Sequence, residues 1–218
     1  MTDRSYAKRE RLVRARFDAE IDRAMAFVEE RLLHLHRGIL GRIYGHVAAA
    51  LFDAVARKEM VRRVDRQLDV LFRAARECGE DLDTARRMHL GAFLETEEAY
   101  LNGNRDHPAW PELVARLDDA FTQRLAHLSA LLHRGRGEDY ESLVRSTFPS
   151  AKEASGAVDR QFEAALAVLE LCERERALLR IPGFLRGDVF RILRELQGWY
   201  RRSLEEEIAR IYAEPAPE

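Results

Sequence analysis

The chain has 218 residues, of which 46% are hydrophobic and 34% charged, and its formal net charge is −2. This length is enough for one large domain or two small ones, each with a hydrophobic core, and the charge excludes a polycation. The two cysteines, Cys78 and Cys172, match neither a disulfide framework nor a metal-binding spacing. The N-terminus is charged and does not resemble a signal peptide, so we expect a cytoplasmic protein.

Charge is unevenly distributed along the chain. Residues 1–16 hold six basic and two acidic residues, and residues 57–76 hold seven basic and three acidic ones. Residues 77–120 hold eleven acidic residues against four arginines. Such segregation lets oppositely charged helices pair within a bundle, or it steers a charged partner.

A first helix is predicted over residues 5–35, because hydrophobic residues recur there every three or four positions. The next stretch, GILGRIYGHVAAALFDAVA at 38–56, is apolar or small on every face, which predicts a central helix buried by its neighbours. Arg42 and His46 interrupt it, so it is too short an apolar run to span a membrane. This helix is expected to continue to Gly79, a residue typical of helix ends.

A third helix is predicted over residues 84–101, with Asp83 as its N-cap. A fourth begins near Pro111, because the first helical turn tolerates proline, and continues to Gly135. The glycine-containing segment RGRGED at 134–139 predicts a flexible linker.

The C-terminal part of the chain predicts three further helices. A short one covers residues 140–148, and Ser150 with Glu153 forms a capping box for a helix that continues to about residue 179. The last helix is expected over residues 188–212.

These elements predict an all-α fold, an antiparallel bundle of six to seven helices that opens with a long helical hairpin. We expect one bundle domain over residues 1–213, with a soft boundary at 135–139, followed by a disordered tail at 214–218.

Metal or catalytic sites often contain histidine, and the chain has seven: His34, His36, His46, His89, His107, His127 and His133. None belongs to an HExxH or ExxH motif. His46 lies in the most apolar predicted helix, with Arg42 one turn before it and Tyr44 nearby, which indicates a candidate ligand pocket. The alternative is a buried imidazole satisfied by one hydrogen bond.

Two pairs of aspartates stand four residues apart, Asp18 with Asp22 and Asp65 with Asp69. At this spacing they resemble the metal-binding acid-x-x-x-Asp motifs of helical phosphate-regulatory proteins of the PhoU type. The alternative is that neighbouring arginines neutralise them in surface ion pairs.

The segment AFLETEEAYL places Glu95 and Glu98 three residues apart and therefore on one helical face. Together with Ala99 and the LHRG sequence at 35–38, it resembles translin-type nucleic-acid-binding proteins over about a dozen residues. That resemblance implies that Glu95 and Glu98 bind a metal ion, whereas salt-bridged acids are the alternative.

A row of basic residues in the predicted second helix could follow a phosphate backbone: Arg57, Lys58, Arg62, Arg63, Arg66 and Arg73. Only Phe72 lies among them as an aromatic residue, so base stacking is not predicted. The simpler alternative is that this basic face packs toward the acidic helices of residues 77–120.

The sequence therefore leads to three hypotheses. The first is a non-enzymatic interaction or scaffold protein that acts through helix faces as a homo-oligomer or as a subunit of a complex. The second is an RNA- or DNA-binding protein that uses the arginine-rich faces, and the third is a ligand- or metal-sensing bundle. No cofactor motif, catalytic motif or membrane-spanning segment is recognised in the sequence. We therefore expect no cofactor and no membrane insertion, and the sequence gives no positive indication of enzyme activity.

Overall fold

The computed structural model describes residues 3–33, 46–50, 52–79, 81–97, 105–178 and 186–213. Within these ranges the chain is all-helical and contains no strand, which confirms the predicted fold class. None of the described helices is both long enough and apolar enough to cross a bilayer.

The structure gives the bounds of these α-helices: α1 (Asp3–Leu33), α3 (Arg57–Cys78), α4 (Leu82–Glu97), α5 (Trp110–Ser129), α6 (Tyr140–Thr147), α7 (Ala151–Arg174) and α8 (Arg186–Ala213). Residues 46–50 are helical as well. Two π-helical turns, η1 (Phe52–Ala56) and η2 (Ala130–Arg134), precede α3 and follow α5, and a 3-10 turn, η3 (Arg176–Leu178), follows α7.

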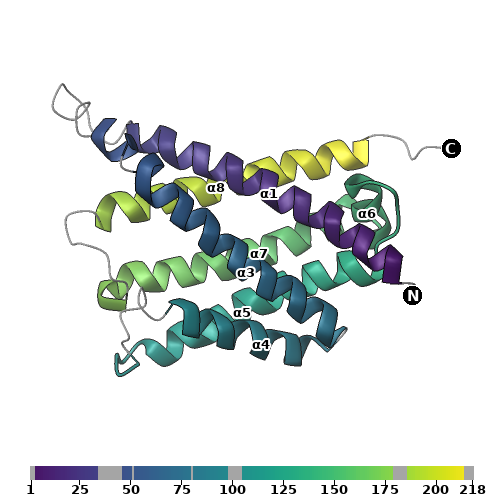
Figure 1. Cartoon of the computed structure of the whole chain (residues 1–218), viewed down its shortest axis with the longest axis horizontal. Helices are drawn as coiled ribbons and strands as arrows, with labels where there is room; N and C mark the ends of the chain where they lie inside the picture. The colour runs from purple at the N-terminus through teal and green to yellow at the C-terminus, as the bar shows by residue number, and fades with distance from the viewer. Residues whose placement is uncertain are drawn as a thin grey trace.

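The long helices form a closed ring of packed neighbours. In the order α1, α8, α7, α5, α4 and α3, each helix contacts the next, and α3 returns to contact α1 (Figure 1). The short helix α6 packs near the N-terminal end of α1, against α1, η2 and α8. This arrangement encloses the core and, as described below, two cavities.

The predicted opening hairpin is present, because α1 and α3 run antiparallel. Their ion pairs follow opposite chain orders: Glu10 with Arg76, Arg14 with Asp69 and Glu29 with Arg57. Phe17 and Phe72 meet edge to face between the two helices, with ring centroids 6.1 Å apart. Both rings pack in the largest core cluster, which α1 and α3 share with α5, η2 and α6.

Several helix ends follow the sequence signals. Gly79 follows α3 with φ of 60°, a conformation that favours glycine. Pro111 lies in the first turn of α5. Ser150 caps α7 by accepting a hydrogen bond from the Glu153 amide at 3.3 Å.

The predicted cap of the third helix is wrong by two residues. Asp81, not Asp83, accepts hydrogen bonds from the Thr84 amide at 3.1 Å and from its hydroxyl at 2.8 Å, so α4 begins earlier than expected. These bonds hold the pKa of Asp81 below its ordinary value. The predicted end of this helix, near residue 101, lies outside the described residues.

The predicted linker at 134–139 is held by specific hydrogen bonds. The Arg136 amide donates to the Ser146 hydroxyl at 2.7 Å, and that hydroxyl donates back to the Arg136 carbonyl at 2.6 Å. Asp139 caps α6 by accepting from the Ser142 amide at 2.8 Å. The turn is therefore part of the packed structure, which corrects the expectation of flexibility. The tail at 214–218 lies outside the described residues.

The stretch predicted as a fully buried central helix is only partly buried. Ala49 and Phe52 are 5% and 7% exposed, but Val47 is 52% exposed and His46 is also exposed. Residues 38–45 and 51 lie outside the described residues. The apolar composition of this stretch therefore does not translate into burial on every face.

Candidate functional site

The structure places the predicted basic row along one surface helix, α3. Lys58, Arg62, Arg66 and Arg73 are exposed, whereas Arg57 and Arg63 are partly buried. Glu59 of the same helix pairs with Arg62 at 2.5 Å and with Arg66 at 3.7 Å. Charged residues of α3 thus form ion pairs within α3 and with α1.

The predicted ligand pocket around Arg42, Tyr44 and His46 stays a prediction. His46 is exposed, so the alternative of a buried, satisfied histidine is wrong. Arg42 and Tyr44 lie outside the described residues.

The predicted metal site of Glu95 and Glu98 stays a prediction. Glu95 is exposed on α4, and Glu98 lies outside the described residues. Among the described residues, no three histidine, cysteine, aspartate or glutamate side chains gather in a way that could hold a metal ion. Arg14 lies 2.6 Å from Asp69 and 4.0 Å from Asp18, so one member of each aspartate pair has an arginine partner.

A cavity of about 590 Å³ lies between α3, α4 and α5; we call it the His89 cavity. Its apolar wall includes Met60, Val64, Leu68, Leu71, Phe93 and Phe121. Its polar wall consists of Glu59, Arg63, Gln67, His89 and Arg124. Its volume lies within the range of about 300–1,000 Å³ that is usual for small-molecule sites, which also combine apolar walls with a few polar groups.

His89 reaches the cavity because it occupies the inner face of α4. Ala85, His89 and Phe93 follow one another at intervals of four residues, so they lie one above the other on the same helical face. Ala85 is 1% exposed and packs in the core, while Phe93 lies against Phe121 of α5 with ring centroids 5.0 Å apart. The helical period thus places an imidazole where a hydrophobic side chain would be expected.

The imidazole of His89 is buried without a well-formed hydrogen bond. It is 1% exposed, and its ring centroid lies 4.4 Å from that of Phe121. A weak hydrogen bond with the Gln67 backbone raises the pKa of His89 a little, but its geometry is poor and neither ring nitrogen is well satisfied among the described residues. Burial, followed by the charge of Arg124, lowers the pKa of His89 to about 4. The ring is therefore neutral at pH 7, with one N–H donor and one nitrogen acceptor, neither of which forms a good hydrogen bond.

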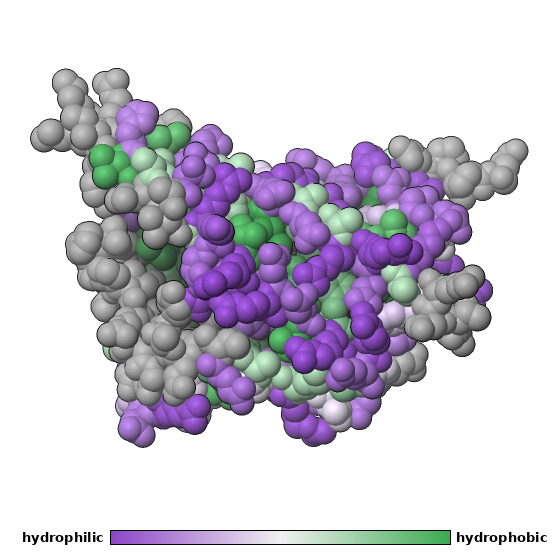
Figure 2. All heavy atoms as spheres, in the orientation of Figure 1, coloured by the Kyte–Doolittle hydropathy of each residue, from purple (hydrophilic) through white to green (hydrophobic). Residues whose placement is uncertain are grey.

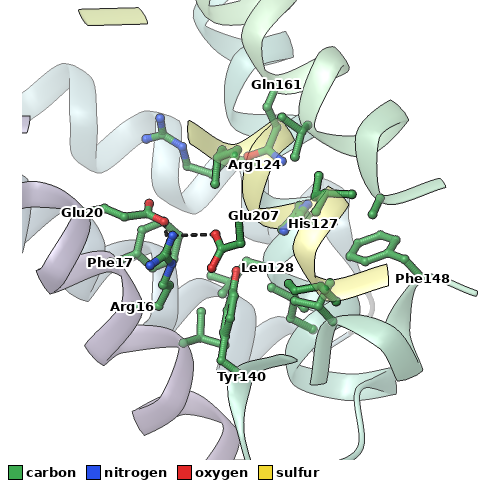
Figure 3. A pocket seen from close by; sticks show the side chains of 18 of the residues that line it. Arg16, Phe17, Glu20, Arg124, His127, Leu128, Tyr140, Phe148, Gln161 and Glu207 are labelled. Atoms are coloured by element: carbon green, nitrogen blue, oxygen red, sulfur yellow. Dashed lines mark hydrogen bonds and ion pairs between the residues drawn. The ribbon is translucent and has the colours of Figure 1, made fainter. Parts of the chain in front are cut away.

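Arg124 lies one turn after Phe121 on α5 and also borders the His89 cavity. Its side chain is exposed, although the protein around the guanidinium lowers its pKa. Within the described part of the chain, Arg124 makes no ion pair or hydrogen bond. Arg124 also lines the smaller cavity beside Arg16, Glu20 and Glu207 (Figure 3).

The second cluster lies between α1, α6 and α8, and we call it the Arg16 cluster. Arg16 lies between two acids, with Nε 2.9 Å from Glu20 and Nη2 2.5 Å from Glu207 (Figure 3). The Tyr200 hydroxyl donates to Glu20, and the Arg16 guanidinium lies 5.8 Å from the ring centroid of Tyr140. Burial, opposed mainly by Arg16, raises the pKa of Glu20 to about 7.

The space beside the Arg16 cluster is too small for an organic ligand. Its volume is about 70 Å³, which is room for a few water molecules. His127 also borders it, with its ring tilted against that of Phe148 at a centroid distance of 5.2 Å, and burial lowers the pKa of this histidine to about 4. We therefore read the Arg16 cluster as a structural polar core and the His89 cavity as the candidate functional site.

Comparison with known proteins adds no functional assignment, because no family model, curated protein or solved structure matches this chain. The short resemblances to PhoU-type and translin-type proteins thus gain no support from these comparisons.

Proposed function

We propose that this protein binds a small, mainly apolar molecule in the His89 cavity. The observation that carries this proposal is the cavity of about 590 Å³, whose mainly apolar wall includes the buried imidazole of His89, a group without a well-formed hydrogen bond. Leaving a buried polar group without a partner costs about 1–3 kcal/mol, whereas a ligand that hydrogen-bonds to it recovers that cost on binding.

Aromatic and aliphatic side chains from three helices supply the rest of the site. Leu68 and Leu71 of α3, Phe93 of α4 and Phe121 of α5 all line the cavity. Burying a ligand there removes its apolar surface from water at about 25 cal/mol per Å². The proposal is close to the predicted ligand-sensing bundle, but at another place and with other residues.

A fluorescence titration with the uncharged probe N-phenyl-1-naphthylamine tests this proposal. We expect saturable binding of one probe per chain, with enhanced emission because the probe leaves water. Val64→Phe, which places a larger side chain in the cavity wall, should weaken probe binding at least tenfold. Val70→Phe is the matched control, because it makes the same change on α3 at a residue that does not line this cavity.

Two results would count against the proposal. One is the absence of saturable binding, and the other is equal binding by wild type and Val64→Phe. Circular dichroism of each variant checks that the helical fold is kept.

A second candidate function, nucleic-acid binding, is favoured by the exposed basic row of α3. Lys58, Arg62 and Arg66 follow at intervals of four residues, and the side chains of Arg62 and Arg66 are 65% and 54% exposed. Hydrophilic side chains cover much of the face that α3 crosses (Figure 2). Glu59 opposes this role, because it pairs with both arginines.

Fluorescence anisotropy with single-stranded RNA and with duplex DNA, at low and moderate salt, tests this candidate. Binding should weaken steeply with salt and be lost in Arg62→Glu/Arg66→Glu. The control Arg191→Glu/Arg194→Glu also removes two exposed, ion-paired arginines, but from α8. Equal binding by the two double variants would contradict the α3 interface.

The predicted role as a homo-oligomer or scaffold in the cytoplasm stays a prediction. Three large hydrophobic residues are exposed in the described ranges, Val47, Met60 and Leu166, and they belong to three different segments. Light scattering over a range of protein concentrations would measure the oligomeric state.

A further inference from the structure

Arg124 is the feature that distinguishes the His89 cavity from a purely apolar pocket. Arg116 of α5 lies 2.6 Å from Glu112, and Arg174 of α7 lies 2.7 Å from the same carboxylate. Arg124 has no ion pair or hydrogen bond to any residue within the described ranges, and its side chain is exposed at the border of the cavity.

Arginine is not deprotonated under ordinary conditions, so the exposed guanidinium of Arg124 keeps its positive charge at the cavity. An anion that enters the cavity would meet a guanidinium that forms no ion pair with a described carboxylate, although Glu20 and Glu207 line the smaller cavity that Arg124 also borders. Charge-assisted hydrogen bonds of this kind are roughly twice as strong as neutral ones.

The other charged groups of the cavity wall also favour an anion. Arg63 of α3 supplies a second positive charge on the wall. Glu59, the acid on the wall, pairs with Arg62 and Arg66. His89 lies close enough to Arg124 for that charge to lower its pKa, so the neutral imidazole and the guanidinium belong to one region of the cavity.

We infer that the ligand of the His89 cavity is an amphipathic anion, such as a medium-chain carboxylate. Its acidic head accepts hydrogen bonds from Arg124 and from the N–H of His89. Its hydrocarbon body packs against Phe93, Phe121 and the leucines of α3. This inference rests on the proposed function, because it names the chemical class of the molecule that the cavity binds.

Competition among three ligands with the same ten-carbon chain tests the inference. Decanoate, decanol and decylamine each displace N-phenyl-1-naphthylamine from the wild-type protein at pH 7.5, and their inhibition constants are compared. We expect decanoate to bind at least tenfold more tightly than decanol, and decylamine to bind most weakly. Tenfold corresponds to about 1.4 kcal/mol, which is within the range of one hydrogen bond to a charged group.

A variant pair then locates the head group. Arg124→Gln should lose the tenfold preference for decanoate while its affinity for decanol stays unchanged. Arg87→Gln on α4 is the control, because Arg87 is exposed and does not line the cavity. Each variant replaces a charged guanidinium with a neutral amide that can still form hydrogen bonds, so the comparison isolates the charge.

The outcomes separate the two proposals. If decanol and decanoate bind the wild-type protein equally well, or if Arg124→Gln keeps the preference, the inference is overturned while the proposed cavity stands. If the uncharged probe shows no saturable binding in the first place, the proposed function fails. The three-ligand comparison uses wild-type protein alone and therefore does not depend on whether a variant folds.

Discussion

Arg16 of α1 and Glu207 of α8 form an ion pair of 2.5 Å in which both side chains are largely buried, with 21% and 14% exposed. The same guanidinium serves Glu20, whose side chain is 9% exposed. One positive charge therefore faces two buried carboxylates. Such a trio is electrically balanced only when one of the acids holds a proton, which agrees with the raised pKa of Glu20.

The first prediction concerns this shared arginine. Replacing Arg16 with Met leaves Glu20 and Glu207 buried without a counter-ion, so Arg16→Met should lower the free energy of unfolding by about 3–5 kcal/mol. Arg201→Met is the matched control, because Arg201 pairs at the surface with Asp159 and should cost at most about 1 kcal/mol. Urea unfolding at pH 7.5 measures both, and equal losses would show that the Arg16 cluster does not stabilise the fold.

The second prediction concerns the effect of pH on stability. The folded protein keeps a proton on Glu20 up to about pH 7, whereas the unfolded chain releases it near the ordinary value of 4.5. The folded state therefore binds more protons between these values, and this contribution to stability falls as pH rises through them. His89 and His127 act in the opposite direction, because their lowered pKa values remove stability as pH falls from 6.5 toward 4.

Glu20→Gln separates these opposing effects. It removes the titrating acid, so the variant should gain stability relative to wild type as pH rises from 5 to 8, by at most about 3 kcal/mol. The titratable and charged groups that act on Glu20 include Arg16, Arg23, Tyr140, Tyr200 and Glu207, and they are the same in both proteins. Thermal melting at several pH values measures the difference, and parallel curves for the two proteins would contradict the assignment to Glu20.

The helices could be predicted from the sequence, and the His89 cavity could not. Hydrophobic periodicity depends only on positions along one helix, so the inner faces of α1, α5 and α8 follow the sequence pattern. Ala85, His89 and Phe93 also share one face by spacing alone, and this is the signal that could have identified His89. Whether that face meets a packed wall or a cavity depends on how α3 and α5 are placed against α4. The hydrophobic periodicity of α4 carries no information about that placement.

The same limit explains the Arg16 cluster. Arg16 and Glu20 are four residues apart, and in sequence they resemble an ordinary surface pair. Their burial results from α8, which brings Glu207 against them from 191 residues along the chain. His46 shows the converse error, because an apolar sequence neighbourhood did not bury its side chain.

The third prediction concerns the trade-off between stability and binding at His89. His89→Leu replaces an unsatisfied polar ring with an apolar side chain, so it should raise the free energy of unfolding of the ligand-free protein by about 1–2 kcal/mol. It should also weaken decanoate binding, because the imidazole N–H is lost. His46→Leu is the control at an exposed histidine. Urea unfolding and probe displacement measure the two effects, and a large loss of stability in His89→Leu would indicate that the imidazole has a partner in the folded protein.

The fourth prediction compares two glycines with contrasting surroundings. A Cβ at Gly135 would lie 2.5 Å from the Leu131 carbonyl oxygen and 2.5 Å from Cδ1 of Leu143, where η2 turns into the hydrogen-bonded segment before α6. Gly156, within α7, has only a flexible atom of Arg160 at 3.6 Å. Gly135→Ala should therefore lower the free energy of unfolding by about 1–3 kcal/mol through overpacking. Gly156→Ala should raise it by about 0.5–1 kcal/mol, because alanine is the better helix former. Chemical unfolding of the two variants side by side measures both signs, and a neutral Gly135→Ala would mean that α6 can move away from η2 without cost.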